Sequence, residues 1–210
     1  MAQQKGLEAY LKFTQEFQTI KNLTPNTLKM TGYIAFLRGI NVSGQKIIKM
    51  EDLKESFISF GLKNVKTFIQ SGNVLFESTD ADPIKLNSKI GKKLSNVLGY
   101  EVPILLRTVA EMEGLIQSDP FKGLKPKESE KMYVTFMNEE PKQKHTLPLF
   151  SSKKDVEIFR MYKQDAFCIS HRINGSFGFP NAFIEKELKV VATTRNWTTV
   201  NKIMALAKRG

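Results

Sequence analysis

Between residues 33 and 107, short apolar runs typical of β-strands alternate with longer stretches in which apolar residues recur at helical spacing. The strand-type runs cover residues 33–37, 65–69, 74–77 and 102–107, and the helical stretches cover 50–60 and 83–98. This β-α-β-β-α-β order predicts an α+β fold whose first half is ferredoxin-like. Strands in such a sheet follow the order 4-1-3-2, and all neighbours are antiparallel.

The rest of the chain carries a less regular pattern of the same kind. A capping box of Thr108 and Glu111 predicts a short helix, and two further helices are expected at 181–188 and 196–207. Strands are expected at 132–137, 156–161 and 167–170. The resulting order, αβαββαα, also places a helix in the stretch that holds Leu147, Leu149 and Phe150. We therefore expect a ferredoxin-like subdomain at 31–108 and a second α/β subdomain, possessing a C-terminal helix, at 109–210.

The first thirty residues are expected to form an extension that is separate from the rest of the fold. Apolar residues between 7 and 20 fit one face of a helix, and turn-forming residues such as Pro25 and Gly32 follow them. Residues 1–30 are thus expected to form a helix and a linker. We expect residues 1–29 to be dispensable for folding of the remainder.

Composition narrows the class of protein. The formal net charge is +11, which favours encounters with anions such as nucleotides and nucleic acid, although a soluble protein rich in lysine has the same charge without such a partner. No apolar run is long enough to cross a bilayer, and no apolar signal core precedes Met30, so we expect a cytoplasmic protein without a membrane partner. One cysteine and two histidines offer little for a metal centre, so we expect no metal and no cofactor, and a monomer by default.

Polar residues gather at three places in the sequence, and the predicted topology brings the first two of them close to one another. The segment 38–41, which follows the first strand, and the turn 70–73 should lie at the same end of the sheet. A third polar segment, 193–200, opens the last helix. The candidate ligand-binding residues are Arg38, Asn41, Lys46, Gln70, Ser71, Asn73, Thr194, Arg195 and Asn196. Guanidinium, ammonium and amide groups of this kind suit a phosphate, a carboxylate or the edge of a nucleobase.

Each of these segments also has a purely structural interpretation. Ser71-Gly72-Asn73 is a good hairpin turn in its own right, and Thr194 or Asn196 can cap the last helix. Arg195 is harder to explain, because a cation is unfavourable at a helix N-terminus. Either a carboxylate neutralises Arg195, or Arg195 and the helix amides share an anion.

Several catalytic chemistries find little support. Cys168 sits in the middle of a predicted strand, and His171 three residues later would face the other way, so a Cys–His pair is not expected. The three polar segments hold no paired carboxylates, and no phosphate-binding or nucleophile-elbow motif occurs. Phe36 and Phe76 lie where RNA-recognition domains carry stacking aromatics, but the accompanying basic-Gly-aromatic signature is missing and both are expected in the core.

The strings YIAFLRGINVSG, VKTFIQSGNVLFES and VATTRNWTTVNKI resemble the three hallmark segments of a bacterial family, domain of unknown function 1697. The resemblance covers roughly residues 31–208 and implies a two-part α/β protein with ferredoxin-like topology, but no established reaction. The family's polar hallmarks map onto Arg38, Gly39, Asn41, Gln70, Ser71, Gly72, Asn73, Thr194, Arg195, Asn196 and Trp197. Ser43 and Thr198 depart from the family pattern, which weakens any binding role for these two residues.

Three functions remain open from the sequence. The first is binding of an anionic ligand (a nucleotide, nucleic acid, or a phosphorylated or carboxylated small molecule) at the surface of the three segments. The second is an enzyme that acts on a small anionic substrate without a covalent nucleophile. The third is a protein-interaction module in which the hallmark residues are structural.

Overall fold

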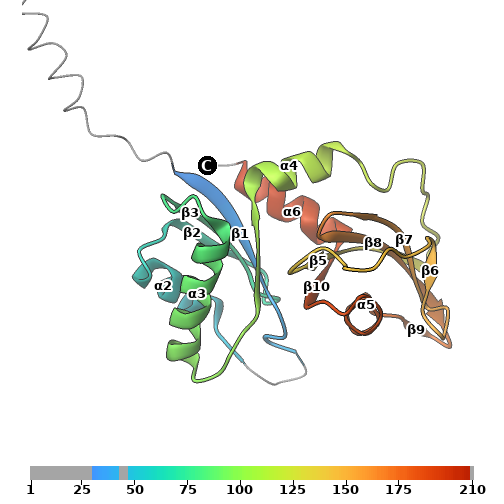
Figure 1. The fold of residues 1–210 in the computed structure, drawn as a ribbon, viewed down its shortest axis with the longest axis horizontal. Helices are drawn as coiled ribbons and strands as arrows, with labels where there is room; N and C mark the ends of the chain where they lie inside the picture. The colour runs from blue at the N-terminus through green and yellow to red at the C-terminus, as the bar shows by residue number, and fades with distance from the viewer. Residues whose placement is uncertain (1–29, 43–46, 209–210) are drawn as a thin grey trace, which may run out of the picture.

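The computed structural model describes residues 30–42 and 47–208 of the chain. The predicted N-terminal helix and linker lie outside the described residues, apart from Met30. Two antiparallel sheets lie side by side, with helices around them (Figure 1). The α+β class predicted from the sequence is therefore confirmed. Among the described residues, no helix combines the length and the apolar character needed to span a membrane.

The first sheet contains four strands in the order β2-β3-β1-β4, and every neighbouring pair is antiparallel. This is the strand order predicted from the element pattern. Its strands are β1 (Thr31–Leu37), β2 (Lys63–Phe68), β3 (Asn73–Ser78) and β4 (Ile104–Thr108). Because β1 is central and pairs with both β3 and β4, its C-terminal end lies beside the β2–β3 turn.

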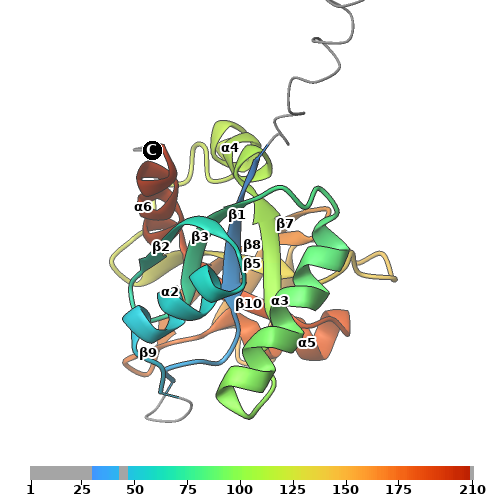
Figure 2. The same cartoon turned by 90° about the vertical axis from the view of Figure 1, so that its left-hand side faces the viewer.

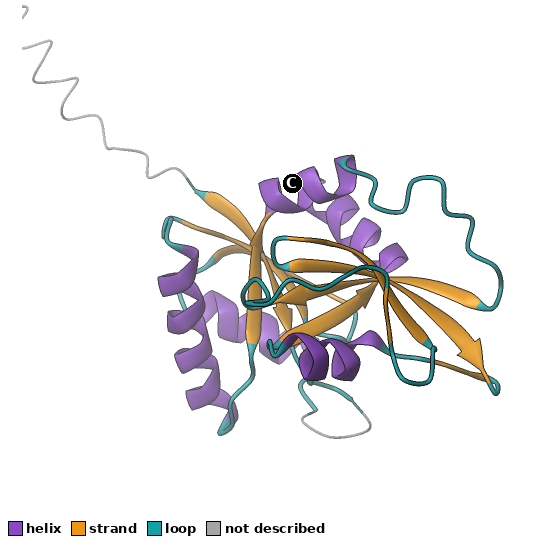
Figure 3. Ribbon diagram, turned by 45° about the vertical axis from the view of Figure 1, so that its right-hand side comes forward, coloured by secondary structure: helices purple, strands orange, loops and turns teal. Residues whose placement is uncertain are grey.

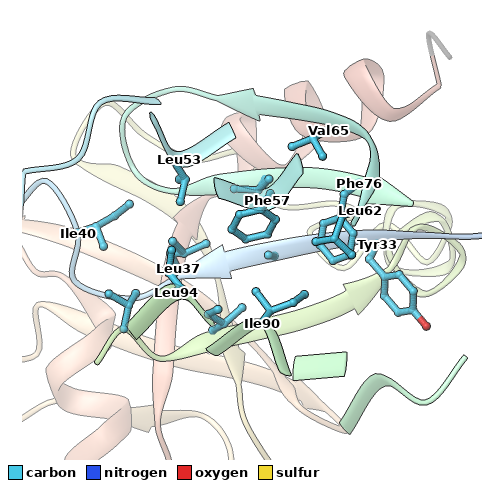
Figure 4. Packing of buried hydrophobic residues seen from close by; sticks show 14 of the residues in the cluster. Tyr33, Leu37, Ile40, Leu53, Phe57, Leu62, Val65, Phe76, Ile90 and Leu94 are labelled. Atoms are coloured by element: carbon cyan, nitrogen blue, oxygen red, sulfur yellow. The ribbon is translucent and has the colours of Figure 1, made fainter. Parts of the chain in front are cut away.

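Helices α2 (Met50–Ser59) and α3 (Pro83–Leu98) cover the outer face of this sheet (Figure 2). Local chemistry sets the ends of α3: the Asp82 side chain accepts from two first-turn amides, Pro83 opens the helix, and Gly99 ends it in the left-handed conformation. The apolar stripes of both helices meet the sheet in one buried cluster centred on Phe57, Phe76 and Tyr33 (Figure 4).

The second sheet has the order β10-β5-β8-β7-β6, and the short strand β9 pairs with β8 beside that path. Its strands are β5 (Glu130–Met137), β6 (Leu149–Phe150), β7 (Val156–Tyr162), β8 (Asp165–Ile173), β9 (Ser176–Phe177) and β10 (Ala192–Asn196). The helices of this half are α4 (Val109–Gln117), α5 (Pro180–Leu188) and α6 (Trp197–Ala207). Figure 3 shows these helices arranged around the second sheet.

Two details of the predicted αβαββαα order are wrong. The stretch with Leu147, Leu149 and Phe150 forms no helix: Leu149 and Phe150 make the short edge strand β6 against β7. The segment at 192–196, expected as a loop and helix start, is strand β10, which pairs with β5. The partner of β10 comes from a distant part of the chain, so local propensity did not indicate a strand, and β6 has only two residues, too few to leave a periodic pattern.

The two halves share an apolar core. Phe36 of the first sheet stacks on Phe136 of the second, with ring centroids 4.0 Å apart. Helices α4 and α6 pack against each other and contribute Met112 and Ile203 to the same cluster. A separate cluster lies between α5 and the other face of the second sheet. The division into two subdomains at residue 108 stays a prediction. The two parts on either side of that residue share one hydrophobic core.

Candidate functional site

The three polar segments meet in space, and for 38–41 and 70–73 the predicted topology required this contact. The Leu37 amide donates to the Gly72 carbonyl at 2.8 Å, so the end of β1 lies against the β2–β3 turn. The Asn41 amide group donates to the Gln70 carbonyl at 2.8 Å, and Arg195 donates to the Ser71 carbonyl at 2.7 Å. We call this meeting point of 37–41, 70–73 and 193–196 the junction.

Arg195 is the centre of the junction. Its Nε donates to Asn73 Oδ1 at 2.6 Å, Nη1 donates to Thr193 Oγ1 and to the Thr194 carbonyl, and Nη2 donates to carbonyls at the end of β1 and in the turn. The guanidinium also lies over the Phe36 ring, 5.7 Å from its centroid. Every N–H group of Arg195 thus has a partner inside the protein.

The expectation that Arg195 begins the last helix is wrong. Arg195 is in β10, and the helix starts at Trp197 after the cap residue Asn196. Only 7% of Arg195 is exposed, and within the described chain no carboxylate pairs with it. Burial lowers the pKa of Arg195 to about 10. The expected carboxylate partner is therefore not found in the described chain, and backbone carbonyls, one hydroxyl and one amide oxygen already accept the N–H groups that a shared anion would need.

Arg38 has a different role at the edge of the junction. Its guanidinium forms a bidentate ion pair with Glu185 of α5, with both distances at 2.7 Å. Glu185 also accepts from the Ala192 amide at 3.0 Å. The hydrogen bond to Glu185 is the main reason that the pKa of Arg38 is raised. Arg38 therefore ties β1 to α5, and its side chain remains 38% exposed.

The asparagines of the junction fix the backbone. Asn41, in the left-handed region at a φ of 54°, donates to Ile48 and Gln70 carbonyls and accepts from the Ile48 amide. Asn73 is fully buried and donates to the Phe68 carbonyl and to Ser71 Oγ. Lys46 lies outside the described residues. Between these asparagines, Gly72 has no room for a side chain, since a Cβ there would lie 2.6 Å from Ile40.

The remaining predicted residues are used in the same manner, with one exception. Thr194 Oγ1 lies 2.8 Å from Thr135 Oγ1, and Asn196 accepts from the Thr198 amide as the cap of α6. Gln70 is exposed, and its side chain makes no hydrogen bond within the described part of the chain. Most polar groups of the junction are therefore already paired, and ligand binding by the nine candidate residues stays a prediction.

A cavity of about 630 Å³ lies elsewhere, between α4 and the turn that joins β7 to β8. We call it the α4 cavity. Its polar lining includes Arg107, Asp165, Arg160 and Lys163, and its apolar lining includes Leu115. None of these residues belongs to the predicted site. No sequence motif marks them, because the hollow exists only where a helix of one segment meets a hairpin of another.

Inside the α4 cavity, Arg107 and Asp165 form a buried ion pair with an Nη2–Oδ1 distance of 2.8 Å. Arg107 also donates to the carbonyls of Leu106, Met137 and Gln164, so its donors are used within the protein. Burial raises the pKa of Asp165, and the charge of Arg107 only partly opposes that shift. A perturbed carboxyl group in a cavity is a recurrent feature of functional sites.

Metal binding and nucleophilic catalysis by cysteine have less support in the described residues. They contain no group of three histidine, cysteine, aspartate or glutamate side chains that could hold a metal ion. Cys168 is fully buried, and burial raises the pKa of its thiol to about 12, which makes it a poor nucleophile.

The fold and the junction define a two-sheet α+β protein whose halves are joined by a buried arginine. This chain belongs to the family described as "Protein of unknown function (DUF1697)", whose model matches residues 30–167. The match spans 167 − 30 + 1 = 138 of the 210 residues and confirms the family resemblance seen in the sequence.

A solved structure, of the conserved bacterial protein SP0830 from Streptococcus pneumoniae, is similar to this one. The TM-score is 0.61 at 21% sequence identity, and the similarity covers 86% of this chain and 99% of that chain. At this identity the similarity concerns the fold. A search of curated proteins finds no match.

Proposed function

We propose that this protein binds an anionic small molecule with an apolar part, and that the ligand occupies the α4 cavity. The observation that carries the proposal is the position of Arg160 and Lys163. Both line the cavity, and neither forms an ion pair with another residue in the described ranges. Cations that face a cavity without an acidic partner favour an anionic ligand.

The charge available to a ligand can be counted from the contacts. Arg107 and Asp165 pair with each other, and Glu111 accepts from the amide and hydroxyl of Thr108 in a capping box. Of the other charged groups in the lining, Arg160 and Lys163 are positive and Glu140 is negative. Glu111 keeps its negative charge in the capping box, so the formal charge of the whole lining is zero, which favours one anionic group at Arg160 and Lys163 over a polyanion.

The size and the apolar lining support a molecule of metabolite size. The volume of about 630 Å³ falls within the range of about 300–1,000 Å³ that is common for small-molecule sites. Pro120, Met161 and Phe167 join Leu115 in the lining, so an aliphatic or aromatic group can be buried there. The cavity also lies where the two halves meet, and ligand sites are frequent at such boundaries.

A thermal-shift screen followed by calorimetry tests this proposal. The panel contains mononucleotides, aromatic and aliphatic carboxylates, and sugar phosphates. A ligand that binds only the folded protein raises the melting temperature. For any such ligand, Arg160→Met and Lys163→Met together should weaken binding by at least about tenfold, since each removes a charge-assisted contact.

Controls separate this site from the other possibilities. Lys92→Met removes an exposed charge of α3 outside the cavity and should leave the affinity unchanged. If a ligand loses affinity with Gln70→Ala but not with the Arg160 and Lys163 variants, it binds at the junction and the proposal is wrong. Turnover of a confirmed ligand would assign an enzyme rather than a binding protein.

A further inference from the structure

The hairpin of β8 and β9 carries a group of basic and aromatic side chains at the opposite end of β8 from the α4 cavity. Arg172 and Phe177 are paired across the hairpin, and Lys131 of β5 lies next to them. Lys131 Nζ is 4.1 Å from the centroid of the Phe177 ring, and the Arg172 guanidinium carbon is 5.0 Å from it. We call Lys131, Arg172, Phe177 and Phe179 the β9 surface.

The two cations of this surface are available to a partner. Lys131 and Arg172 are exposed, and neither is in an ion pair with another residue that the structure describes. Their contacts with Phe177 hold the positive charges over the face of its ring. The β9 surface therefore presents two positive charges that have no acidic partner among the described residues.

Phe179 supplies an exposed ring on the same side of β5 as Lys131, because it packs against Tyr133, two residues further along that strand. It is 58% exposed, and it stands edge-on to the half-buried Tyr133 at 5.9 Å between ring centroids. Most large apolar side chains of this fold are covered, and an exposed phenylalanine next to cations is a typical recognition element. The ring faces available on Phe179 are suited to stacking with another planar group.

The backbone under Phe179 is held firmly. Ser170 Oγ donates to the Gly178 carbonyl at 2.7 Å. A Cβ on Gly178 would lie 2.6 Å from the Asp155 carbonyl oxygen, so this segment is pressed against the loop before β7. Phe177 and Phe179 are therefore fixed in place on either side of Gly178, and little entropy is lost when a partner contacts them.

We propose that the β9 surface binds single-stranded nucleic acid. Phe179 stacks on a base, and Lys131 and Arg172, which both lie over the Phe177 ring, contact neighbouring phosphates. Single-stranded chains expose base faces that a duplex hides, and their proteins combine aromatic platforms with positive charge in this manner. The net charge of +11 adds long-range attraction for a polyanion. This site lies about 20 Å along β8 from the α4 cavity and is independent of the ligand proposed there.

Fluorescence anisotropy with labelled single-stranded oligonucleotides of about 12 nucleotides tests the proposal, with DNA and RNA versions and a duplex of the same sequence. We expect the single strands to bind more tightly than the duplex at low salt. Phe179→Ala should weaken binding by about 5- to 100-fold, the effect of losing one stacked base. Lys131→Met with Arg172→Met should reduce the slope of log affinity against log salt by about 1.4, or about 0.7 per phosphate contact.

Two variants keep the test independent of folding. Phe179→Trp retains a stacking ring and should bind at least as well as the native protein, whereas Phe150→Ala removes an exposed ring of β6 and should change nothing. The proposal is overturned if no oligonucleotide binds at low salt, or if Phe179→Ala binds as well as Phe150→Ala. Binding to anionic lipid vesicles but not to oligonucleotides, lost in the same variants, would also overturn it.

Discussion

Replacement of Arg195 by methionine should destabilise the protein more than any other single change at the junction. The substitution keeps an apolar stem of similar length but removes all five N–H donors. It leaves the carbonyls of Leu37 and Ser71 and the side-chain oxygen of Asn73 without their guanidinium partner, whereas the Gly72 carbonyl keeps the Leu37 amide. A buried acceptor that loses its partner costs about 1–3 kcal/mol, so three of them cost about 3–9 kcal/mol.

Part of this cost is offset, because the variant no longer buries a charged guanidinium. That relief amounts to several kcal/mol, and we expect a net loss of about 3–5 kcal/mol in the free energy of unfolding. Urea denaturation at neutral pH measures it through the midpoint at constant m.

Arg38→Met is the matched control. The Arg38–Glu185 pair is also bidentate, but the Arg38 side chain is 38% exposed, so its loss should cost about 1 kcal/mol or less. If Arg195→Met is no more destabilising than Arg38→Met, the hydrogen bonds of Arg195 do not stabilise the junction as we expect. A double-mutant cycle with Asn73→Ala should give a coupling energy of about 1–3 kcal/mol, because Asn73 Oδ1 accepts from Arg195 at 2.6 Å.

Further outcomes follow from burial and backbone geometry. Cys168, whose thiol pKa burial raises to about 12, should not react with Ellman's reagent at pH 8 until the protein is unfolded; rapid labelling of the folded protein would contradict its burial. Burial raises the pKa of Asp165, so the folded state binds this proton more tightly than the unfolded state does. The protonated carboxyl group therefore contributes fully to stability below its unfolded pKa, which is about 3.9. That contribution is lost as the pH rises through its pKa in the folded protein. The stability of Asp165→Asn relative to the native protein should therefore increase with pH across that window, and a flat difference in urea titrations would refute the shift. Gly72→Ala should cost more than about 1 kcal/mol in the same assay, because φ is +72° and a Cβ would meet Ile40. A chain that starts at Met30 should melt at the same temperature as the full chain, and insolubility of that shorter chain would show that residues 1–29 are needed.

The first half of the fold could be predicted because its signals are local. Asp82, Pro83 and Gly99 mark the ends of α3 within the sequence itself, and α3 spans Pro83–Leu98 as expected. Strand β1 ends at Leu37, where the apolar run ends. Periodicity and capping residues act over a few positions, so a single sequence is sufficient to recognise them.

The second half and the details of the junction depend on distant partners. Thr193, Thr194 and Arg195 form a buried strand, although three consecutive polar residues are typical of a loop. What makes their burial possible is a set of acceptors such as the Leu37 carbonyl, 158 residues away in the chain. The predicted topology placed the segments 38–41 and 70–73 near one another, but the sequence did not indicate that the polar groups of all three segments would bind each other.

The α4 cavity and the β9 surface illustrate the same limit. Arg160 lies in β7 and Lys163 in the turn that follows, and in the sequence both resemble ordinary solvated charges; only the packing of α4 places them in a cavity lining. Lys131 and Phe177 are 46 residues apart in sequence, and only the pairing of β5, β8 and β9 brings them together. Neither arrangement leaves a motif in a single sequence.

The core shared by the two sheets also determines when the protein can finish folding as it is synthesised. Phe36 and Leu105 leave the ribosome early, whereas Ile203 and Met204, which cover the same cluster, belong to the last helix. At a synthesis rate of about 5–20 residues per second, the intervening stretch of about 100 residues takes roughly 5–20 s to appear. Through that interval the first sheet has helices on one face and bare apolar side chains on the other. We therefore expect the nascent chain to bind chaperones, and a stop codon ahead of α6 should release a protein prone to aggregation.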